Sequence, residues 1–149
     1  MTVVIPAQAI ADAKSADSEL WPVLLALAGP ESSWRSDAIG DKGCSIGYLQ
    51  MNMCGGLGTP YSRQELLDGV RNFSLGAQYI RQERAGGKSL YDALWPWSAR
   101  PQAWALLRRM ESEGIEGIGA IGVFTGGGNA GGGFLILGLI ALGIIIVLR

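Results

Sequence analysis

One carboxylate near the start of the chain stands in a sequence context that suits acid–base chemistry. Glu31 follows the apolar run 20–28 and precedes two serines, a tryptophan and a polar loop that contains glycines. At the end of a buried helix, its carboxyl group would meet the negative end of the helix dipole and lose part of its hydration, and both effects raise a carboxyl pKa. Glu31 is therefore a candidate general acid for protonating a glycosidic oxygen; the alternative is an exposed glutamate in a turn.

The absence of histidine narrows the chemistry further. With no histidine among its 149 residues, the chain cannot form a Ser-His-Asp triad, a Cys-His peptidase site or a histidine-containing zinc site. We expect chemistry carried by carboxylates, hydroxyls, lysine or cysteine, with no metal ion and no cofactor. The formal net charge is −1, and Lys and Arg are scattered along the sequence, so we expect no nucleic acid partner.

The two cysteines lie on either side of the segment IGYLQMN. A disulfide between Cys44 and Cys54 would close a short loop beside the Glu31 region. The other interpretation is a pair of small, partly buried residues. Two thiols without histidine do not complete a tetrahedral zinc site.

Apolar spacing and capping signals predict a mainly α domain over residues 1–113, with five or six helices around one loop-built site. Helices are expected over residues 3–14, from residue 19 to a stop at Gly29-Pro30, from the capping box Ser62–Glu65 to Gly86-Gly87, after Ser89, and from Pro101 onward. Glu31 would then lie at or beyond the end of the second helix. A small hairpin is expected within residues 43–52. In the long helix after Ser62, the apolar positions Val70, Phe73, Ala77 and Ile80 keep a helical spacing.

The composition changes after residue 113. Residues 114–133 are rich in glycine, which is typical of a flexible linker, and residues 134–149 read FLILGLIALGIIIVLR. The uncharged apolar residues favour a membrane anchor. As a helix they would be about 22 Å long, so the anchor would be short compared with the ~30 Å thickness of a hydrocarbon core. The alternatives are a buried core helix and packing of the tail against copies of the chain. Residues 1–19 do not resemble a secretory signal peptide.

Three motifs follow one another between residues 20 and 97. Glu31-Ser32 stands just after an apolar run, and Gly47-Tyr48-Leu49-Gln50 follows a glycine-containing loop. A later helix has the form N-x-x-x-G-A-x-Y-I, with Asn72, Gly76, Ala77, Tyr79 and Ile80. In this order the motifs resemble those of the lytic transglycosylase family of the lysozyme superfamily, in particular the short versions carried by bacteriophages. The sequence departs from the family where A-Y-N often stands, because it has Ala93-Leu94-Trp95-Pro96-Trp97 there.

The resemblance implies a lysozyme-like fold and cleavage of the MurNAc–GlcNAc bond of peptidoglycan, with Glu31 as the single general acid and base. Glu31 would protonate the glycosidic oxygen and then, as a carboxylate, deprotonate the C6 hydroxyl of MurNAc. An anhydro product would form without consumption of water, so one carboxylate would suffice.

The family pattern also implies the residues that bind the substrate. Ser32 would hydrogen-bond Glu31 or the acetamido group of the substrate. Gln50 and the backbone of Gly47 and Tyr48 would line the sugar cleft. Trp97 would replace the family's tyrosine as a stacking face, with core packing as the alternative for Trp95 and Trp97.

Two alternative functions stay open. If Asp37 or Asp41 faces Glu31 across the cleft, the second carboxylate would activate water and the enzyme would be a hydrolytic muramidase. The domain could also serve without catalysis, as a structural or wall-binding module of a virion.

The domain order suggests a setting for the activity. A wall-cleaving domain with an apolar tail suits a membrane-associated virion protein that opens the cell wall during genome delivery. A tail-anchored enzyme of the bacterial membrane is the alternative. The expected partners are peptidoglycan strands, a membrane, and other virion proteins or copies of the chain.

The anchor hypothesis predicts that solubility and activity can be separated. Deletion of the residues after Glu116 should leave a soluble protein that still cuts peptidoglycan, because Glu31 and Gln50 lie upstream. In the full-length chain, Gly138→Lys with Ala141→Lys should cost about 2.5 to 3.5 kcal/mol each on insertion scales and release the protein from membranes. Flotation with liposomes compares the three proteins. A wild-type chain that stays at the bottom of the gradient, or a truncated chain that aggregates without activity, would contradict the anchor.

Overall fold

The structure is a computed structural model, and it describes residues 3–115. In this part of the chain the helices are α1 (Ala7–Ala16), α2 (Trp21–Ser32), α3 (Arg63–Leu67), α4 (Gly69–Ala85), α5 (Leu90–Ala93) and α6 (Arg100–Ser112), with a short 3₁₀ turn η1 (Asp41–Gly43). Three two-residue strands, β1 (Ile39–Gly40), β2 (Ser45–Ile46) and β3 (Met51–Asn52), pair antiparallel in the order β1-β2-β3. The mainly α class and the hairpin expected within residues 43–52 are confirmed.

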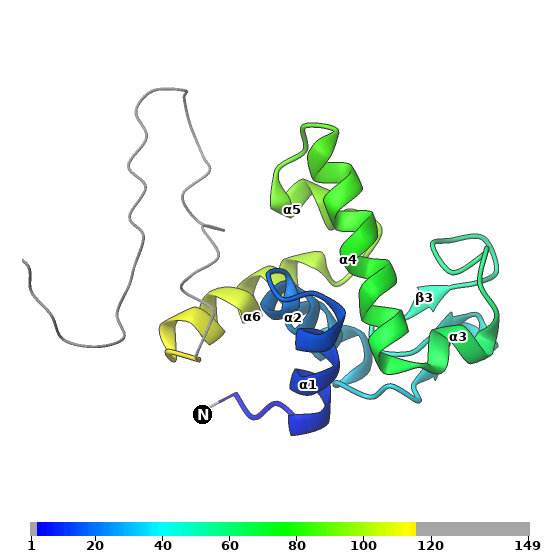
Figure 1. The fold of residues 1–149 in the computed structure, drawn as a ribbon, viewed down its shortest axis with the longest axis horizontal. Helices are drawn as coiled ribbons and strands as arrows, with labels where there is room; N and C mark the ends of the chain where they lie inside the picture. The colour runs from blue at the N-terminus through cyan, green and yellow to red at the C-terminus, as the bar shows by residue number, and fades with distance from the viewer. Residues whose placement is uncertain (1–2, 116–149) are drawn as a thin grey trace, which may run out of the picture.

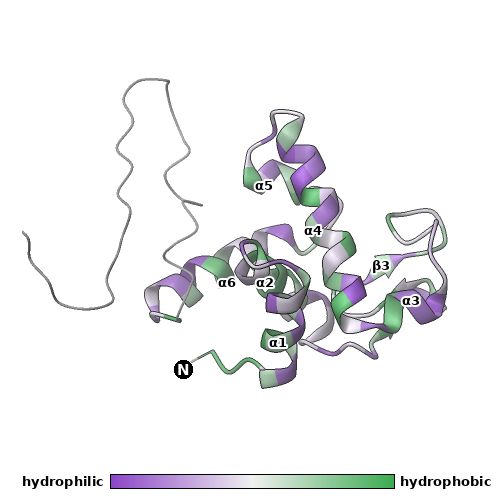
Figure 2. Ribbon diagram, in the orientation of Figure 1, coloured by the Kyte–Doolittle hydropathy of each residue, from purple (hydrophilic) through white to green (hydrophobic). Residues whose placement is uncertain are grey.

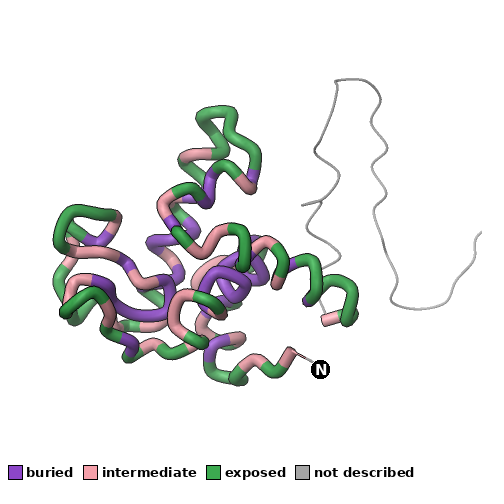
Figure 3. Tube along the Cα trace, turned by 180° about the vertical axis from the view of Figure 1, so that it is seen from behind, coloured by how far each residue is buried: buried purple, intermediate pink, exposed green. Residues whose placement is uncertain are grey.

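Helix α2 forms the centre of the core. All eight residues from Trp21 to Ala28 are buried, as expected for a helix that is apolar on every side. Helices α1 and α6 both pack against it, and α2 lies between α6 and α4 in Figure 1. Figure 3 shows the buried residues gathered in this central region, whereas α4 carries both hydrophilic and hydrophobic residues (Figure 2).

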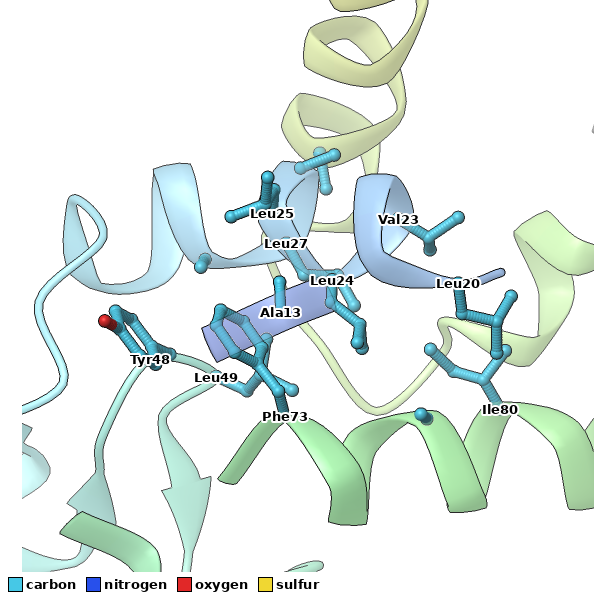
Figure 4. Packing of buried hydrophobic residues seen from close by; sticks show 14 of the residues in the cluster. Ala13, Leu20, Val23, Leu24, Leu25, Leu27, Tyr48, Leu49, Phe73 and Ile80 are labelled. Atoms are coloured by element: carbon cyan, nitrogen blue, oxygen red, sulfur yellow. The ribbon is translucent and has the colours of Figure 1, made fainter. Parts of the chain in front are cut away.

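The core joins α2 to α4 through large apolar side chains. Leu24 of α2 and Phe73 and Ile80 of α4 are completely buried and lie in one cluster (Figure 4). Burial of each such side chain stabilises the fold by about 1.5 to 3 kcal/mol relative to exposure. Val70 belongs to the same helix, as its spacing predicted, but its side chain is exposed. It occupies the first turn of α4, one residue after the start of the helix at Gly69.

Helix α2 ends later than the sequence pattern indicated. The predicted stop at Gly29-Pro30 is wrong, because the helix continues through Pro30 to Ser32. A proline disfavours the α conformation of the residue before it through a clash with that residue's Cβ, and Gly29 has no Cβ. Ser33 then ends the helix in the left-handed conformation, and its N–H bonds the carbonyl of Gly29 at 2.9 Å. Glu31 consequently lies in the last turn of α2.

The helices after the hairpin begin where capping signals stand. Ser62 and Glu65 form the predicted capping box at the start of α3, and the Asp68 side chain accepts a hydrogen bond from the N–H of Arg71 at the start of α4. The Ser89 hydroxyl caps α5 in the same manner. These side chains satisfy backbone N–H groups that have no partner within the helix.

Asn72 attaches the β2–β3 hairpin to α4. Its side chain is fully buried. Its Oδ1 accepts a hydrogen bond from the N–H of Leu49 at 2.9 Å, while its Nδ2 donates to the carbonyls of Ile46 at 3.0 Å and Leu66 at 2.8 Å. Both Nδ2 protons and one Oδ1 lone pair are therefore used, and three buried backbone groups from two segments depend on one amide.

Gly76 stands one turn after Asn72 and makes room for the same hairpin. A Cβ atom at this position would lie 2.3 Å from the Cδ1 atom of Leu49, and Leu49 is completely buried. Asn72 thus bonds the backbone of Leu49 while Gly76 accommodates its side chain. The N-x-x-x-G spacing has a packing explanation in this structure, since residues four apart share one helix face.

A disulfide bond joins Cys44 and Cys54 across the open end of the hairpin. Beside it, the N–H of Met53 bonds the carbonyl of Cys44 at 2.8 Å. The disulfide interpretation of the two cysteines is confirmed. The cross-link reduces the conformational freedom of the unfolded loop that it closes.

Within residues 3–115, no helix combines the length and the apolar character needed to cross a membrane. The expected anchor at 134–149 and nearly all of the expected linker at 114–133 lie outside the described residues.

We predict that Asn72→Ala destabilises the protein by about 3 kcal/mol or more. The substitution leaves one buried N–H and two buried carbonyls without partners, and each costs about 1 to 3 kcal/mol. Urea denaturation of the full-length protein measures the free energy of unfolding. Gln78→Ala, at an exposed position of the same helix, is the control and should change it by less than about 0.5 kcal/mol. Equal stability of the two variants would show that Asn72 does not hold the hairpin.

Candidate functional site

Glu31 opens onto a cleft of about 370 Å³ between the end of α2, the hairpin and the segment before α6. The cleft is lined by side chains from these three regions: Glu31, Asp41, Ser45, Gln50, Asn52, Pro96, Trp97 and Ser98. Three of the residues expected at the site, Glu31, Gln50 and Trp97, therefore meet in one cleft.

The Glu31 carboxyl group is only partly solvated. Its Oε1 atom accepts a hydrogen bond of 3.3 Å from the N–H of Ala99, the residue that precedes α6. Burial raises the pKa of Glu31 above its ordinary value, the Ala99 hydrogen bond opposes this change, and the charge of Asp41 adds to it. The predicted direction of the pKa shift is confirmed, with burial as its main cause. A raised pKa favours the protonated form of the carboxyl group, which is the form that a general acid needs.

Asp41 is the second carboxylate of the cleft. Its Oδ2 atom accepts a hydrogen bond from the Ser45 hydroxyl, and Ser45 is itself buried. Asp37, the other acid near Glu31 in sequence, is highly exposed and pairs with Arg35. Of the two candidate second carboxylates, the one that lines the cleft with Glu31 is Asp41.

The backbone around the cleft adopts conformations that are rare for residues with a side chain. Ser33 and Trp34, directly after the Glu31-Ser32 pair, have φ angles of 53° and 57°. Asp41 and Gln50 have φ angles of 48° and 46°. Such conformations cost of order 1 kcal/mol or more each and persist where the surrounding structure enforces them, which is frequent at functional sites. Two of the four residues line the cleft itself.

Hydrogen bonds hold Gln50 in place at the cleft. Its Nε2 atom donates to the carbonyls of Gly47 at 3.0 Å and Ala38 at 3.3 Å. A Cβ atom on Gly40 would lie 2.4 Å from the Oε1 atom of Gln50, so the amide oxygen packs closely against Gly40. Gln50 is therefore held at the wall of the cleft by contacts at both ends of its amide.

Trp97 forms a wall of the cleft from a largely buried position. Its side chain is 5% exposed, its Nε1 atom donates to the carbonyl of Leu49 at 2.9 Å, and its ring packs edge-on against Tyr79. Most of the Trp97 side chain is packed in the core, as the alternative interpretation expected, and a small part of the residue lines the cleft. Trp95 is not a core residue, because it is 58% exposed and donates a hydrogen bond to Glu83.

Two expected site residues do not line the cleft. The Ser32 hydroxyl donates to the carbonyl of Ala28 at 3.0 Å and accepts from the N–H of Arg35 at 3.3 Å, so it closes the end of α2 and makes no hydrogen bond to Glu31. The Tyr48 side chain is buried and stacks on Phe73 with a centroid distance of 4.4 Å. Its hydroxyl, visible at the edge of the cluster in Figure 4, donates to Asp12. Packing against α4 therefore keeps the Tyr48 side chain out of the cleft.

Sequence reasoning did not identify Ser45, Asn52 and Ser98 as cleft residues. Ser45 and Asn52 form a cross-strand pair of the hairpin, so the same pairing brings both to the cleft. Which hairpin side chains face the cleft depends on the exact register of the strand pairing. The sequence of a short polar segment does not specify that register. Ser98 precedes α6 and carries no sequence signal of its own.

The arrangement offers one partly buried acid, a second carboxylate held by a hydroxyl, and the amide groups of Gln50 and Asn52 beside Trp97. Such a set can protonate a leaving oxygen and orient a polar substrate. Within the described residues, no three Cys, Asp or Glu side chains gather in a way that could hold a metal ion.

Comparisons of the chain with models of known families, with curated proteins and with solved structures find no match.

We predict that Glu31→Gln stabilises the protein at neutral pH. The pKa of Glu31 is raised in the folded state, so ionisation of this group weakens the fold as the pH rises above about 4.5, and the penalty is complete above the folded-state pKa. The stability gain of Glu31→Gln should be largest at pH 7 and vanish near pH 4. Melting temperatures of the full-length protein across this range provide the measurement.

The matched control is Glu111→Gln, because Glu111 is an exposed glutamate of α6. It should change the melting temperature little at either pH. A Glu31→Gln protein that melts below the wild type at pH 7 would mean that the carboxylate stabilises the fold.

Proposed function

We propose that the chain is a peptidoglycan lytic transglycosylase that cleaves the MurNAc–GlcNAc bond with Glu31 as the general acid and base. The observation that carries the proposal is the Glu31 carboxyl group: it lies in the last turn of a buried helix, opens onto a cleft, and has a raised pKa. A group of this kind can give a proton to the leaving oxygen and later accept one. The order of the three sequence motifs supports peptidoglycan as the substrate class.

In the proposed mechanism, protonated Glu31 gives its proton to the glycosidic oxygen. The resulting carboxylate then accepts the proton of the C6 hydroxyl of MurNAc as this oxygen attacks the anomeric carbon. The leaving sugar keeps the first proton, the 1,6-anhydro bond forms, and Glu31 ends protonated as it began. The Ala99 N–H, within 3.3 Å of Oε1, stabilises the carboxylate between the two steps.

Hydrolysis is the second candidate function, and the position of Asp41 favours it. Asp41 lines the same cleft, its charge raises the pKa of Glu31, and Ser45 fixes its carboxylate. In a hydrolase, Asp41 would orient or deprotonate a water molecule that attacks the anomeric carbon. The product would then carry a reducing MurNAc end instead of an anhydro end.

The cellular setting belongs to the same proposal. The apolar segment 134–149 would anchor the enzyme to a membrane of a virion, or to the bacterial membrane, and the domain would open the wall during genome delivery. A non-catalytic wall-binding module is the outcome if no cleavage of peptidoglycan occurs.

We predict that Glu31→Gln lowers the rate of peptidoglycan cleavage at least about a hundredfold, because the amide keeps the side-chain volume but cannot transfer a proton. Asp41→Asn decides between the two reactions. A transglycosylase should retain anhydro products in this variant, whereas a hydrolase should lose its reducing-end products to a similar extent as Glu31→Gln.

Mass spectrometry of the products from purified peptidoglycan measures both outcomes. Asp37→Asn is the matched control, since Asp37 is exposed and lies outside the cleft lining, and it should cleave like the wild type. Full activity of Glu31→Gln would remove this residue from the mechanism.

A further inference from the structure

The disulfide bond of the hairpin stands beside three lining residues of the cleft. Cys44 directly precedes Ser45. Cys54 follows Asn52 by two residues. Asp41 stands three residues before Cys44, and its carbonyl accepts a hydrogen bond from the Cys44 N–H at 3.2 Å. The cross-link therefore joins the two segments that bring these three side chains to the cleft.

The two ends of the hairpin are held by different means. At its closed end, the side chains of Asn72 and Trp97 bond the backbone of Leu49. At its open end, the strands are joined by the disulfide and by a hydrogen bond of 2.8 Å from the N–H of Met53 to the carbonyl of Cys44. Because no cysteine takes part in the contacts of the closed end, loss of the cross-link would leave that end attached to the core.

The segment before Cys44 has a conformation that needs support. Asp41 and Lys42 have φ angles of 48° and 55°, and Gly43 follows with 96°. Left-handed conformations of residues with a side chain persist where the surrounding structure enforces them. Two-residue strands give little support of their own, since a short hairpin is marginally stable without further packing. The covalent bond at Cys44 is therefore a main restraint on the position of Asp41.

The disulfide is accessible to reagents in solution, because Cys54 is exposed, whereas Cys44 is half-buried. A thiolate of a dithiol reductant can attack the Sγ atom of Cys54, which forms a mixed disulfide and releases Cys44 as a thiolate that takes up a proton. The second thiol of the reductant then displaces Cys54 as a thiol and closes a cyclic disulfide. Two electrons and two protons pass from the dithiol to the two cysteines, and a disulfide oxidant reverses the reaction.

We propose that the disulfide between Cys44 and Cys54 is a redox switch of the cleft. With the bond formed, Asp41, Ser45 and Asn52 line the cleft. After reduction, the open end of the hairpin separates and these side chains leave the cleft, while the rest of the domain stays folded. The reduced protein then cleaves peptidoglycan more slowly than the oxidised protein. The effect on cleavage rests on the proposed function, whereas the opening of the hairpin does not.

A switch of this kind suits an enzyme that is made in a reducing compartment and acts outside it. Thiols stay reduced in the bacterial cytosol, and disulfides form and persist outside it, where the wall lies. The chain has two cysteines in total, so no other thiol of the chain competes for the pairing. The cleft would be incomplete where the chain is synthesised and complete at its substrate.

The first measurement follows the hairpin itself, by residue-resolved amide hydrogen exchange of the full-length protein with and without a dithiol reductant. In the reduced protein, the Met53 N–H should exchange within about tenfold of the rate of an unfolded chain, because the open end no longer protects it. The Leu49 N–H should stay protected at least about a hundredfold, since its partner is the Asn72 side chain. A Met53 N–H whose protection does not change, or a Leu49 N–H that loses its protection too, would overturn the inference.

The second measurement is the rate of peptidoglycan cleavage by the oxidised and reduced proteins. Reduction should lower the rate at least about tenfold, because displaced cleft groups no longer meet the substrate, and a disulfide oxidant should restore it. The matched control is Cys44→Ser with Cys54→Ser, which cannot form the bond. It should cleave at the rate of the reduced protein, with or without reductant. A reduced wild-type protein that cleaves as fast as the oxidised protein would contradict the switch.

The two proposals can fail independently. A protein that cleaves nothing in either form, but loses protection of the Met53 N–H on reduction, would lose the enzymatic function and keep the redox-controlled hairpin. A protein that cleaves peptidoglycan equally fast in both forms would keep the function and lose the switch.

Discussion

The three hydrogen bonds of the buried Asn72 amide determine where the hairpin lies, and the cleft depends on that position. Asn72 bonds the backbone of Ile46 and Leu49 on the hairpin and of Leu66 before α4. Trp97 bonds the carbonyl of Leu49 from the other side. The peptide units of one residue are therefore held by side chains from two distant segments, and Gln50 follows directly. If this attachment were lost, the buried backbone groups would need water, and the hairpin would separate from α4.

Opposing electrostatic effects meet at Glu31. Burial and the charge of Asp41 favour its protonated form, while the Ala99 N–H favours the carboxylate. The net result is a raised pKa, and the proposed mechanism would use both forms, the acid to give a proton and the carboxylate to accept one. Asp41 distinguishes the two proposed reactions, because its carboxylate is held by Ser45 in the same cleft. Attack by a water molecule on the anomeric carbon would give hydrolysis, and attack by the sugar's own hydroxyl would give the anhydro product.

The elements that could be predicted from sequence are those with strong local signals. The capping residues Ser62 and Ser89 mark helix starts because their hydroxyls satisfy nearby N–H groups. The apolar run of α2 indicates a buried helix from composition alone. Local rules failed where a neighbouring residue changed their outcome. The helix continues through Pro30 because the residue before it, Gly29, has no Cβ atom to clash with the proline ring.

The sequence by itself determined that no histidine of this chain can take part in its chemistry, that Glu31 stands near the C-terminal end of a buried helix, and that Gln50 and Trp97 were candidates for a site with it. Tertiary structure decided which side chains meet. Tyr48 stacks on Phe73 instead of facing the cleft, Ser32 closes its own helix, and Asp41 lines the cleft where Asp37 points to solvent. These outcomes depend on hairpin register and on contacts between segments far apart in the chain. Spacing along a sequence constrains such contacts only when a repeating pattern spans them, and a loop with two-residue strands has no such pattern.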